Sequence, residues 1–270
     1  MTRSDSDATD APAASSRYFT SSDGVRLHVL EAGAEHAGTV IVLVPGWSMP
    51  ASIWQAQLSS LGRRHHVVAF DPRGQGRSDI PADGYHIDRR ADDLHELVAQ
   101  YPRVVLVGWS LGALEALQYL HRHGDAKVAA LVLVDSSIGE GPDSGPSGLP
   151  DALRRDRRET VTDFIQAIFK TPRTKAEQDT LLEAALRMPL EHSIALFPST
   201  VPRAHWRTLT RDLTRPLLYV VTPQFAAQAH ELKAGRPATQ VEVFETAGHA
   251  LFVDEPERFN RLIEDFARNR

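Results

Sequence analysis

The stretch that most constrains the fold runs from Val104 to Gly112 and reads Val-Val-Leu-Val-Gly-Trp-Ser-Leu-Gly. Its apolar, β-branched first half is typical of a buried strand, and a helical pattern follows directly. A Gly-x-Ser-x-Gly sequence between a strand and a helix predicts a sharp turn that exposes the serine hydroxyl. Glycines suit both flanks because the turn is strained and neighbouring chain passes close by. Ser110 is therefore the candidate nucleophile; the alternative is a serine in an ordinary strand-to-helix loop.

Composition excludes several other classes of protein. The chain has 270 residues, of which 42% are hydrophobic, enough for one large core or one core with a small appended domain. A net charge of -5 argues against nucleic acid or an anionic membrane as the main partner. The absence of cysteine excludes disulfides, thiolate metal sites and cysteine nucleophiles. Residues 1–16 are polar and lack the apolar segment of a secretory signal, so we predict a disordered tail and a cytoplasmic location.

The rest of the chain alternates between strand-like and helical patterns. Strands are expected at residues 17–20, 25–31, 39–44, 67–70, 129–134, 217–221 and 241–244, and helices at 52–61, 87–100, 224–233 and 255–268. This alternation predicts an α/β fold with a doubly wound, mostly parallel sheet. We expect the core of this fold to comprise residues 17–138 and 214–270. Residues 139–213 contain a Gly/Pro/Ser loop and helical patterns, which predict a helical cap over the carboxyl ends of the strands, where ligands bind.

Four segments of this chain resemble the α/β-hydrolase fold family, and the resemblance extends from about Arg17 to the carboxyl terminus. They are Pro45-Gly46-Trp47, the loop Asp71-Pro-Arg-Gly-Gln-Gly-Arg-Ser, the Ser110 turn, and Gly248-His249-Ala-Leu-Phe-Val-Asp-Glu-Pro. The Gly-Trp-Ser-Leu-Gly turn and the helical cap are most similar to small serine carboxylesterases, such as esterases of pimeloyl-carrier-protein methyl esters. The resemblance implies a serine hydrolase with a catalytic triad.

A serine nucleophile needs a neutral imidazole to accept its proton. Among the 12 histidines, His249 follows the last strand-like run and comes after Ser110, as the chain order of this fold requires. We predict that His249 is the base; the alternative is a loop histidine that hydrogen-bonds backbone.

The triad acid departs from the family pattern. Most members carry it just after the strand that precedes the last one, but residues 222–229 contain no carboxylate. Asp135 directly follows the strand after the Ser110 unit, and certain haloalkane dehalogenases place their acid there. We therefore predict Asp135 as the acid, although relatives with the usual acid also carry Asp here. Asp254 is expected to cap a helix, and Asp71 to be a structural carboxylate of the Arg73 loop.

Two backbone amides are expected to stabilise the oxyanion: that of Leu111, which follows the nucleophile, and that of Trp47. The indoles of Trp47 and Trp109 could line an acyl pocket or pack in the core. In the cap, four arginines could form a solvated face or bind an acidic carrier protein: Arg154, Arg155, Arg157 and Arg158.

These residues predict hydrolysis of small carboxylic esters or lactones through an acyl-enzyme, with no metal or cofactor. A perhydrolase or a carbon–carbon bond hydrolase would use the same residues. A ligand-binding receptor with weak turnover is the alternative from another class, favoured by the empty usual position of the acid.

Overall fold

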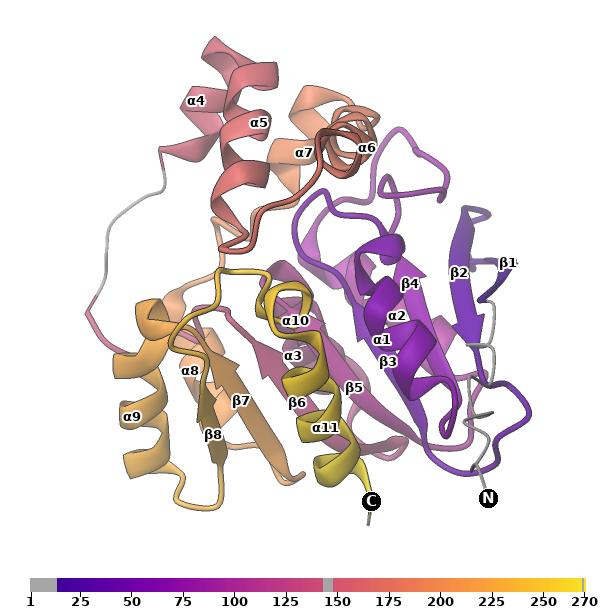
Figure 1. Ribbon diagram of the computed structural model, residues 1–270, viewed down its shortest axis with the longest axis vertical. Helices are drawn as coiled ribbons and strands as arrows, with labels where there is room; N and C mark the ends of the chain where they lie inside the picture. The colour runs from indigo at the N-terminus through magenta and orange to yellow at the C-terminus, as the bar shows by residue number, and fades with distance from the viewer. Residues whose placement is uncertain (1–13, 143–147, 269) are drawn as a thin grey trace, which may run out of the picture.

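The sheet of the computed structural model matches the predicted fold class, and the structure describes residues 14–142, 148–268 and 270. Within these ranges eight strands form one sheet in the order β1-β2-β4-β3-β5-β6-β7-β8 (Figure 1). The first two, β1 (Ser15–Thr20) and β2 (Arg26–Ala32), form an antiparallel hairpin, and β2 is antiparallel to β4. The other pairs are parallel and join β3 (Val40–Val44), β4 (Val67–Asp71), β5 (Val104–Trp109), β6 (Val128–Val134), β7 (Leu217–Val221) and β8 (Gln240–Val243).

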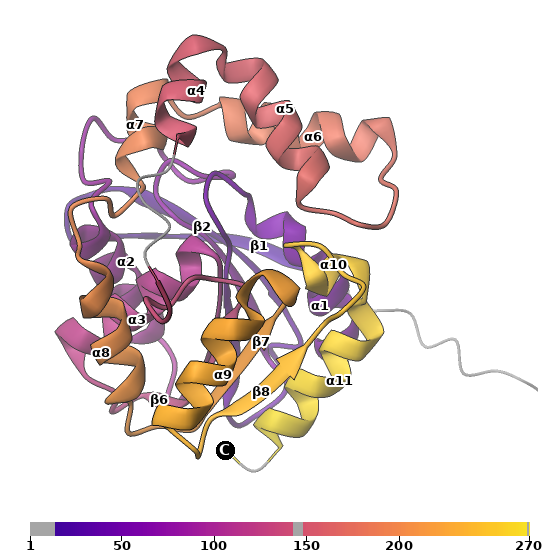
Figure 2. The ribbon, with the colours of Figure 1, turned by 90° about the vertical axis from the view of Figure 1, so that its left-hand side faces the viewer.

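Helices cover both faces of the sheet, which explains why its central strands are continuous apolar runs. Every residue of β3 to β7 is buried, as expected for parallel strands packed on both sides. The helix α1 (Gln55–Leu61), preceded by the short helix η1 (Ala51–Trp54), contacts α11 (Pro256–Ala267), whereas α2 (Ile87–Val98) contacts α3 (Leu111–His123) (Figure 2). Three more helices complete this part: η2 (Pro223–Phe225), α9 (Ala226–Gly235) and α10 (Leu251–Asp254).

The predicted insertion between β6 and β7 contains no strand within its described residues. Four of its helices gather at one end of the molecule, namely α4 (Leu149–Arg155), α5 (Arg157–Ala167), α6 (Lys175–Leu186) and α7 (Leu190–Ala195) (Figures 1 and 2). The fifth, α8 (Arg203–Arg211), instead packs against α3 beside the sheet. We use the word cap for α4–α7 and their connecting loops.

The cap contacts the loops at the carboxyl ends of the strands. The indole Nε1 of Trp47, just after β3, donates to the carbonyl oxygen of Ser193 in α7 at 2.7 Å. The amide of Ala250, after β8, donates to the carbonyl oxygen of Ile168 at 2.8 Å. These two bonds place the cap over the edge of the sheet to which Ser110 belongs.

The predicted tail lies outside the described residues as far as residue 13, and its last two residues, Ser15 and Ser16, begin β1. In the described ranges no helix has both the length and the apolar character needed to span a membrane.

Candidate active site

Ser110 lies in the turn between β5 and α3 with φ 54° and ψ −118°, a conformation that a residue with a side chain rarely adopts. Glycine is required at positions 108 and 112 because neighbouring backbone atoms lie too close for a side chain. A Cβ on Gly112 would lie 2.6 Å from the carbonyl oxygens of Val44 and Pro45, and one on Gly108 would overlap with the backbone of Gly112. The strained backbone of Ser110 therefore results from packing on all sides, which is characteristic of functional turns.

Asp135 and His249 are in direct contact. Asp135 immediately follows β6, is fully buried and has φ 43°. Its Oδ2 accepts a hydrogen bond from Nδ1 of His249 at 2.7 Å, and its Oδ1 accepts one from the backbone N–H of Thr222 at 2.6 Å. The strand end after β7, where the resemblance to α/β-hydrolases leads one to expect the acid, supplies a backbone donor to Asp135 instead of a carboxylate.

Two further contacts hold the loop that carries His249. Trp109, at the end of β5, donates its indole N–H to the carbonyl oxygen of His249 at 2.8 Å. Asp254 accepts from the amide of Gly248 at 2.7 Å and from the amides of Lys170 and Thr171 in the cap at 2.9 and 3.0 Å. The expectation that Asp254 caps a helix is wrong, because its carboxylate instead joins the His249 loop to the cap. Burial raises the pKa of this carboxyl, but the hydrogen bonds from Thr171, Lys170 and Gly248 lower it overall.

The two amides expected to stabilise an oxyanion belong to the buried residues Trp47 and Leu111. Neither amide has a hydrogen-bond acceptor within the part of the chain that the structure describes. A Cβ built on Gly46 would lie 3.1 Å from Cβ of Ser110, so the Gly46–Trp47 peptide lies against the nucleophile turn. The N–H of Leu111 is the first of helix α3 and has no intrahelical acceptor for that reason, so it can donate to a ligand oxygen beside Ser110.

The indoles of Trp47 and Trp109 make contacts that favour packing over an exposed pocket wall. Trp47 is 4% exposed and stacks on Phe197 at 5.3 Å between ring centroids, with Phe164 edge-on at 5.4 Å. Trp109 is fully buried against His249 and Phe252. Trp47 thereby joins the loop after β3 to the cap. Trp109 supports the loop that carries His249 from its place at the end of β5.

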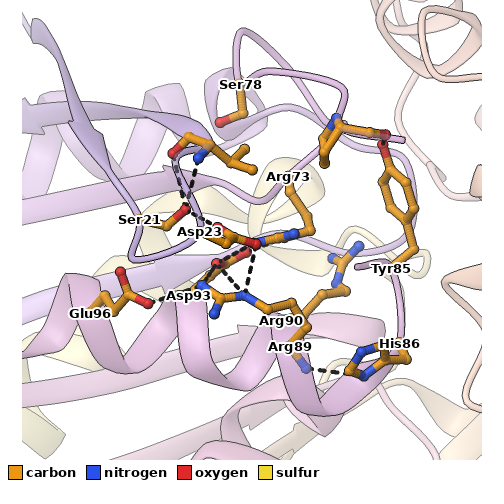
Figure 3. A network of polar contacts seen from close by, with 12 residues as sticks. Ser21, Asp23, Arg73, Ser78, Tyr85, His86, Arg89, Arg90, Asp93 and Glu96 are labelled. Carbon is orange, nitrogen blue, oxygen red and sulfur yellow. Dashed lines mark hydrogen bonds and ion pairs between the residues drawn. The ribbon is translucent and has the colours of Figure 1, made fainter. Parts of the chain in front are cut away.

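The glycine-rich loop after β4 is held by buried polar contacts, but not by a pair between Asp71 and Arg73. Asp71 accepts from His28 Nδ1 at 2.6 Å and from the amide of Ala51 at 2.5 Å. Arg73 instead binds both oxygens of Asp93 on α2, at 2.6 and 2.7 Å, and Asp23 at 2.9 Å (Figure 3). Asp71 is thus a structural carboxylate, and the loop is tied to α2 through Arg73.

A family model described as the alpha/beta hydrolase family matches residues 41–262 of the chain. The chain belongs to the alpha/beta hydrolase family. The non-heme chloroperoxidase CPO-A1 of Kitasatospora aureofaciens is 27% identical over 92% of this chain and 98% of its own length. A pimeloyl-[acyl-carrier protein] methyl ester esterase of Vibrio cholerae is 28% identical over 85% of this chain and 94% of its own. The structure of the esterase RhEst1 from Rhodococcus sp. ECU1013 is similar with a TM-score of 0.81 and 27% identity, covering 94% of this chain and 99% of that one.

The cap arginines of this alpha/beta hydrolase mostly bind within the cap. Arg154 on α4 pairs with Glu191 on α7 at 2.9 Å, and Arg158 on α5 pairs with Glu183 on α6 at 2.8 Å. The half-buried Arg157 donates to the carbonyl oxygens of Met188 and Ala185. Arg155 has no polar partner among the described side chains. The pairs of Arg154 and Arg158 are largely exposed to solvent, so these contacts favour the interpretation of a solvated face.

Sequence reasoning missed one group near the site of this alpha/beta hydrolase. Gln75, Arg90 and Glu115 are all buried and are linked to one another behind the Gly46–Trp47 peptide. The available signal was that Arg90 and Glu115 stand among apolar residues on one face of their predicted helices. The spacing of residues in the sequence does not show that these two helices meet the loop that carries Gln75.

Proposed function

We propose that this alpha/beta hydrolase is a serine esterase of small carboxylic esters or lactones, with Ser110 as nucleophile, His249 as base and Asp135 as acid. The observation that carries the proposal is the 2.7 Å hydrogen bond between Asp135 Oδ2 and His249 Nδ1. A carboxylate at Nδ1 keeps the proton on that nitrogen, so that Nε2 is free to accept the proton of a serine. The buried carboxylate also stabilises the imidazolium that then forms.

In the proposed reaction, the hydroxyl oxygen of Ser110 attacks the ester carbonyl carbon while its proton moves to Nε2 of His249. The amides of Trp47 and Leu111 donate to the oxyanion, and a donor in this position commonly contributes ~10²–10³ to the rate. The imidazolium protonates the leaving alcohol, and water then releases the acid from the acyl-enzyme by the same steps. None of these steps requires a metal or a cofactor.

The likeness to the bifunctional esterase/perhydrolase DCH of Acinetobacter calcoaceticus, 35% identical over 57% of this chain and 54% of its own length, favours a second candidate, perhydrolysis, in which hydrogen peroxide replaces water in the second step. The acyl-enzyme and the residues are the same, so the two activities differ only in the preferred acceptor. A ligand-binding receptor with weak turnover, the candidate from another class, was favoured only by the missing carboxylate after β7. The 2.7 Å contact of Asp135 with His249 supplies a carboxylate to the imidazole from another strand end and so supports the esterase. A carrier-protein ester as substrate rests on the likeness to the Vibrio cholerae esterase, and the paired cap arginines give it little support.

The cytoplasmic location and the division of the chain into core and cap stay predictions.

Hydrolysis of p-nitrophenyl acetate and p-nitrophenyl butyrate tests the hypothesis that the protein is an esterase. We expect Ser110→Ala to abolish turnover, while Ser137→Ala leaves it unchanged. Ser137 is a matched control because its hydroxyl lies near the end of the adjacent strand β6 and contacts Gln228. Equal rates for Ser110→Ala and the wild type would remove the proposed function. Adding hydrogen peroxide and assaying peracid separates perhydrolysis from hydrolysis.

A further inference from the structure

A buried chain of polar side chains lies directly behind the Gly46–Trp47 peptide. Gln75, 1% exposed in the loop after β4, donates from Nε2 to the carbonyl oxygen of Gly46 at 3.1 Å and to that of Met49 at 2.8 Å. Its Oε1 accepts a hydrogen bond from Arg90 of α2 at 3.0 Å. Arg90 in turn forms an ion pair with Glu115 of α3, and neither side chain is exposed to solvent.

We propose that Gln75 is a positioning residue that fixes the direction of the Trp47 N–H, and that the Arg90–Glu115 pair holds Gln75 for this task. The proposal rests on the proposed function, because it assigns Trp47 N–H the role of oxyanion donor.

The geometry of one peptide group carries the first step. The carbonyl of Gly46 and the N–H of Trp47 belong to the same peptide unit, which is planar and trans, so the two groups point in opposite directions. Gln75 binds the carbonyl end. The N–H of Trp47 must then point away from Gln75, and it has no acceptor among the described residues. One side-chain amide therefore decides where the donor points.

The loop needs such a support because its own backbone is strained. The Met49 amide donates to the Gly46 carbonyl oxygen at 3.2 Å and closes a tight turn. Within this turn Ser48 has φ 56°, a left-handed conformation that costs free energy for a residue other than glycine. Gln75 binds the carbonyls at both ends of the turn and so stabilises the conformation that presents Trp47 N–H.

The orientation of the Gln75 amide is fixed by its partners. Arg90 can only donate and the two backbone carbonyls can only accept, so the oxygen of Gln75 faces Arg90 and its NH₂ group faces the loop. Without Arg90 the amide would lose the contact that prevents it from rotating. Arg73 and Arg89 both bind Asp93 (Figure 3), whereas Arg90, next to Arg89 on α2, turns to Gln75 and Glu115.

The Arg90–Glu115 pair is poorly suited to stabilising the fold by itself. Nε and Nη1 of Arg90 are buried and have no hydrogen-bond partner within the described ranges. A buried ion pair with unsatisfied donors often contributes less to stability than apolar residues of the same volume would. Because the pair contributes little to the stability of the fold, holding Gln75 in place is the better explanation of why two charged side chains are buried here.

The test compares Gln75→Leu with Gln118→Leu. Gln118 is a matched control, because its amide is also buried and bonded at both ends, to Asp88 at 2.6 Å and to His205 at 2.8 Å, on the α3 surface away from the turn. For Gln75→Leu we expect kcat for p-nitrophenyl acetate to fall about 10- to 100-fold with KM changed less than about threefold, since misplacing a catalytic group by ~1 Å can cost ~10² in rate. The inhibition constant of a boronic acid, whose adduct with Ser110 places an oxygen at the proposed oxyanion site, should rise by the same factor. Gln118→Leu should change neither. Gln75→Met serves as the second variant if Gln75→Leu does not fold.

A second readout does not depend on activity. In protein labelled with ¹⁵N-tryptophan, the amide resonance of Trp47 should shift in Gln75→Leu, while that of Trp206 on α8 stays in place. An unchanged Trp47 resonance overturns the proposal, and so does a Gln75 variant with wild-type kcat. If the wild type hydrolyses no ester, the proposed function fails, and the Trp47 resonance still decides whether Gln75 orients this peptide.

The ion pair is tested by the double variant Arg90→Met/Glu115→Met, which removes both charges and keeps the core filled. We expect kcat to fall about three- to tenfold while the midpoint of urea unfolding is unchanged or higher. An unchanged kcat would show that the pair does not act through Gln75. A loss of stability that accounts for the whole loss of activity would assign the pair to the fold alone.

Discussion

Replacing Asp135 by asparagine is the sharpest test of the proposed triad, because the structure determines how the new amide would lie. The backbone N–H of Thr222 donates to Oδ1 of Asp135 at 2.6 Å, and the N–H cannot move without disturbing the end of β7. An asparagine must therefore place its carbonyl oxygen toward Thr222. Its NH₂ group then faces Nδ1 of His249, where the carboxylate oxygen had been at 2.7 Å.

A donor in that position reverses the tautomer of the imidazole. Nδ1 must accept, so the proton moves to Nε2, and His249 can no longer take the proton of Ser110. The loss expected for a wrong tautomer is ~10⁴ in kcat, which corresponds to about 5.4 kcal/mol in activation free energy at 1.36 kcal/mol per tenfold. KM should change little, since neither oxygen of Asp135 is exposed to a substrate.

The assay is p-nitrophenyl acetate hydrolysis, with thermal unfolding measured in parallel. Glu140→Gln is the matched control, because Glu140 is another buried carboxylate that follows β6 and is paired with Arg211 at 2.6 Å. We expect the control to lose stability and keep its kcat. If Asp135→Asn retains more than a tenth of the wild-type kcat, the tautomer reasoning is refuted and another group orients His249.

Two further predictions concern the support of the site. Trp109→Phe removes the 2.8 Å bond to the His249 carbonyl oxygen and should lower kcat about fivefold, the equivalent of one hydrogen bond of ~1 kcal/mol; unchanged kinetics would show that this loop needs no such bond. Burial, opposed by the Arg90 charge, raises the pKa of Glu115 from 4.5 to about 7. The folded protein therefore keeps a proton that the unfolded chain releases between about pH 4.5 and 7, so this carboxyl makes stability fall as the pH rises through that window and has no further effect above it. Urea unfolding at pH 5 and pH 7.5 should show this slope in the wild type and lose it in Glu115→Gln; an equal slope in both would contradict the assignment.

The strands and the turn at Ser110 could be predicted because each depends on a local pattern. Val104 to Trp109 is apolar throughout since both faces of β5 are covered, and the glycines at 108 and 112 record a backbone too crowded for side chains. Asp135 was also accessible to sequence reasoning, since a carboxylate at a strand end must lie at the edge of the sheet. Its contact with His249, 114 positions later in the chain, depends on the whole fold.

Contacts between distant segments could not be predicted. The helix α8 lies within the predicted insertion, and its contact with α3 could not be predicted, because its amphipathic pattern shows that one face is buried but not against which partner. Asp254 stands where a helix begins, yet its carboxylate reaches Lys170 and Thr171 in the cap. The burial of Gln75 could not be predicted from the sequence. A glutamine in a glycine-rich loop is expected to be exposed to solvent, and only the placement of α2 and α3 beside the loop buries it.

The position of Asp135 also changes how the chemistry is divided along the chain. Under the proposed assignment, the nucleophile, the acid and both oxyanion amides precede the cap insertion, and only His249 follows it. A chain cut within the insertion would thus yield one fragment with every proposed group except the base, and a second fragment that contributes a single imidazole and the Thr222 N–H. Recovery of turnover on mixing such fragments would report on one event, the docking of β7 against β6, which brings His249 to Asp135. With the acid after β7, both the acid and the base would lie on the second fragment, and they could pair before the fragments meet.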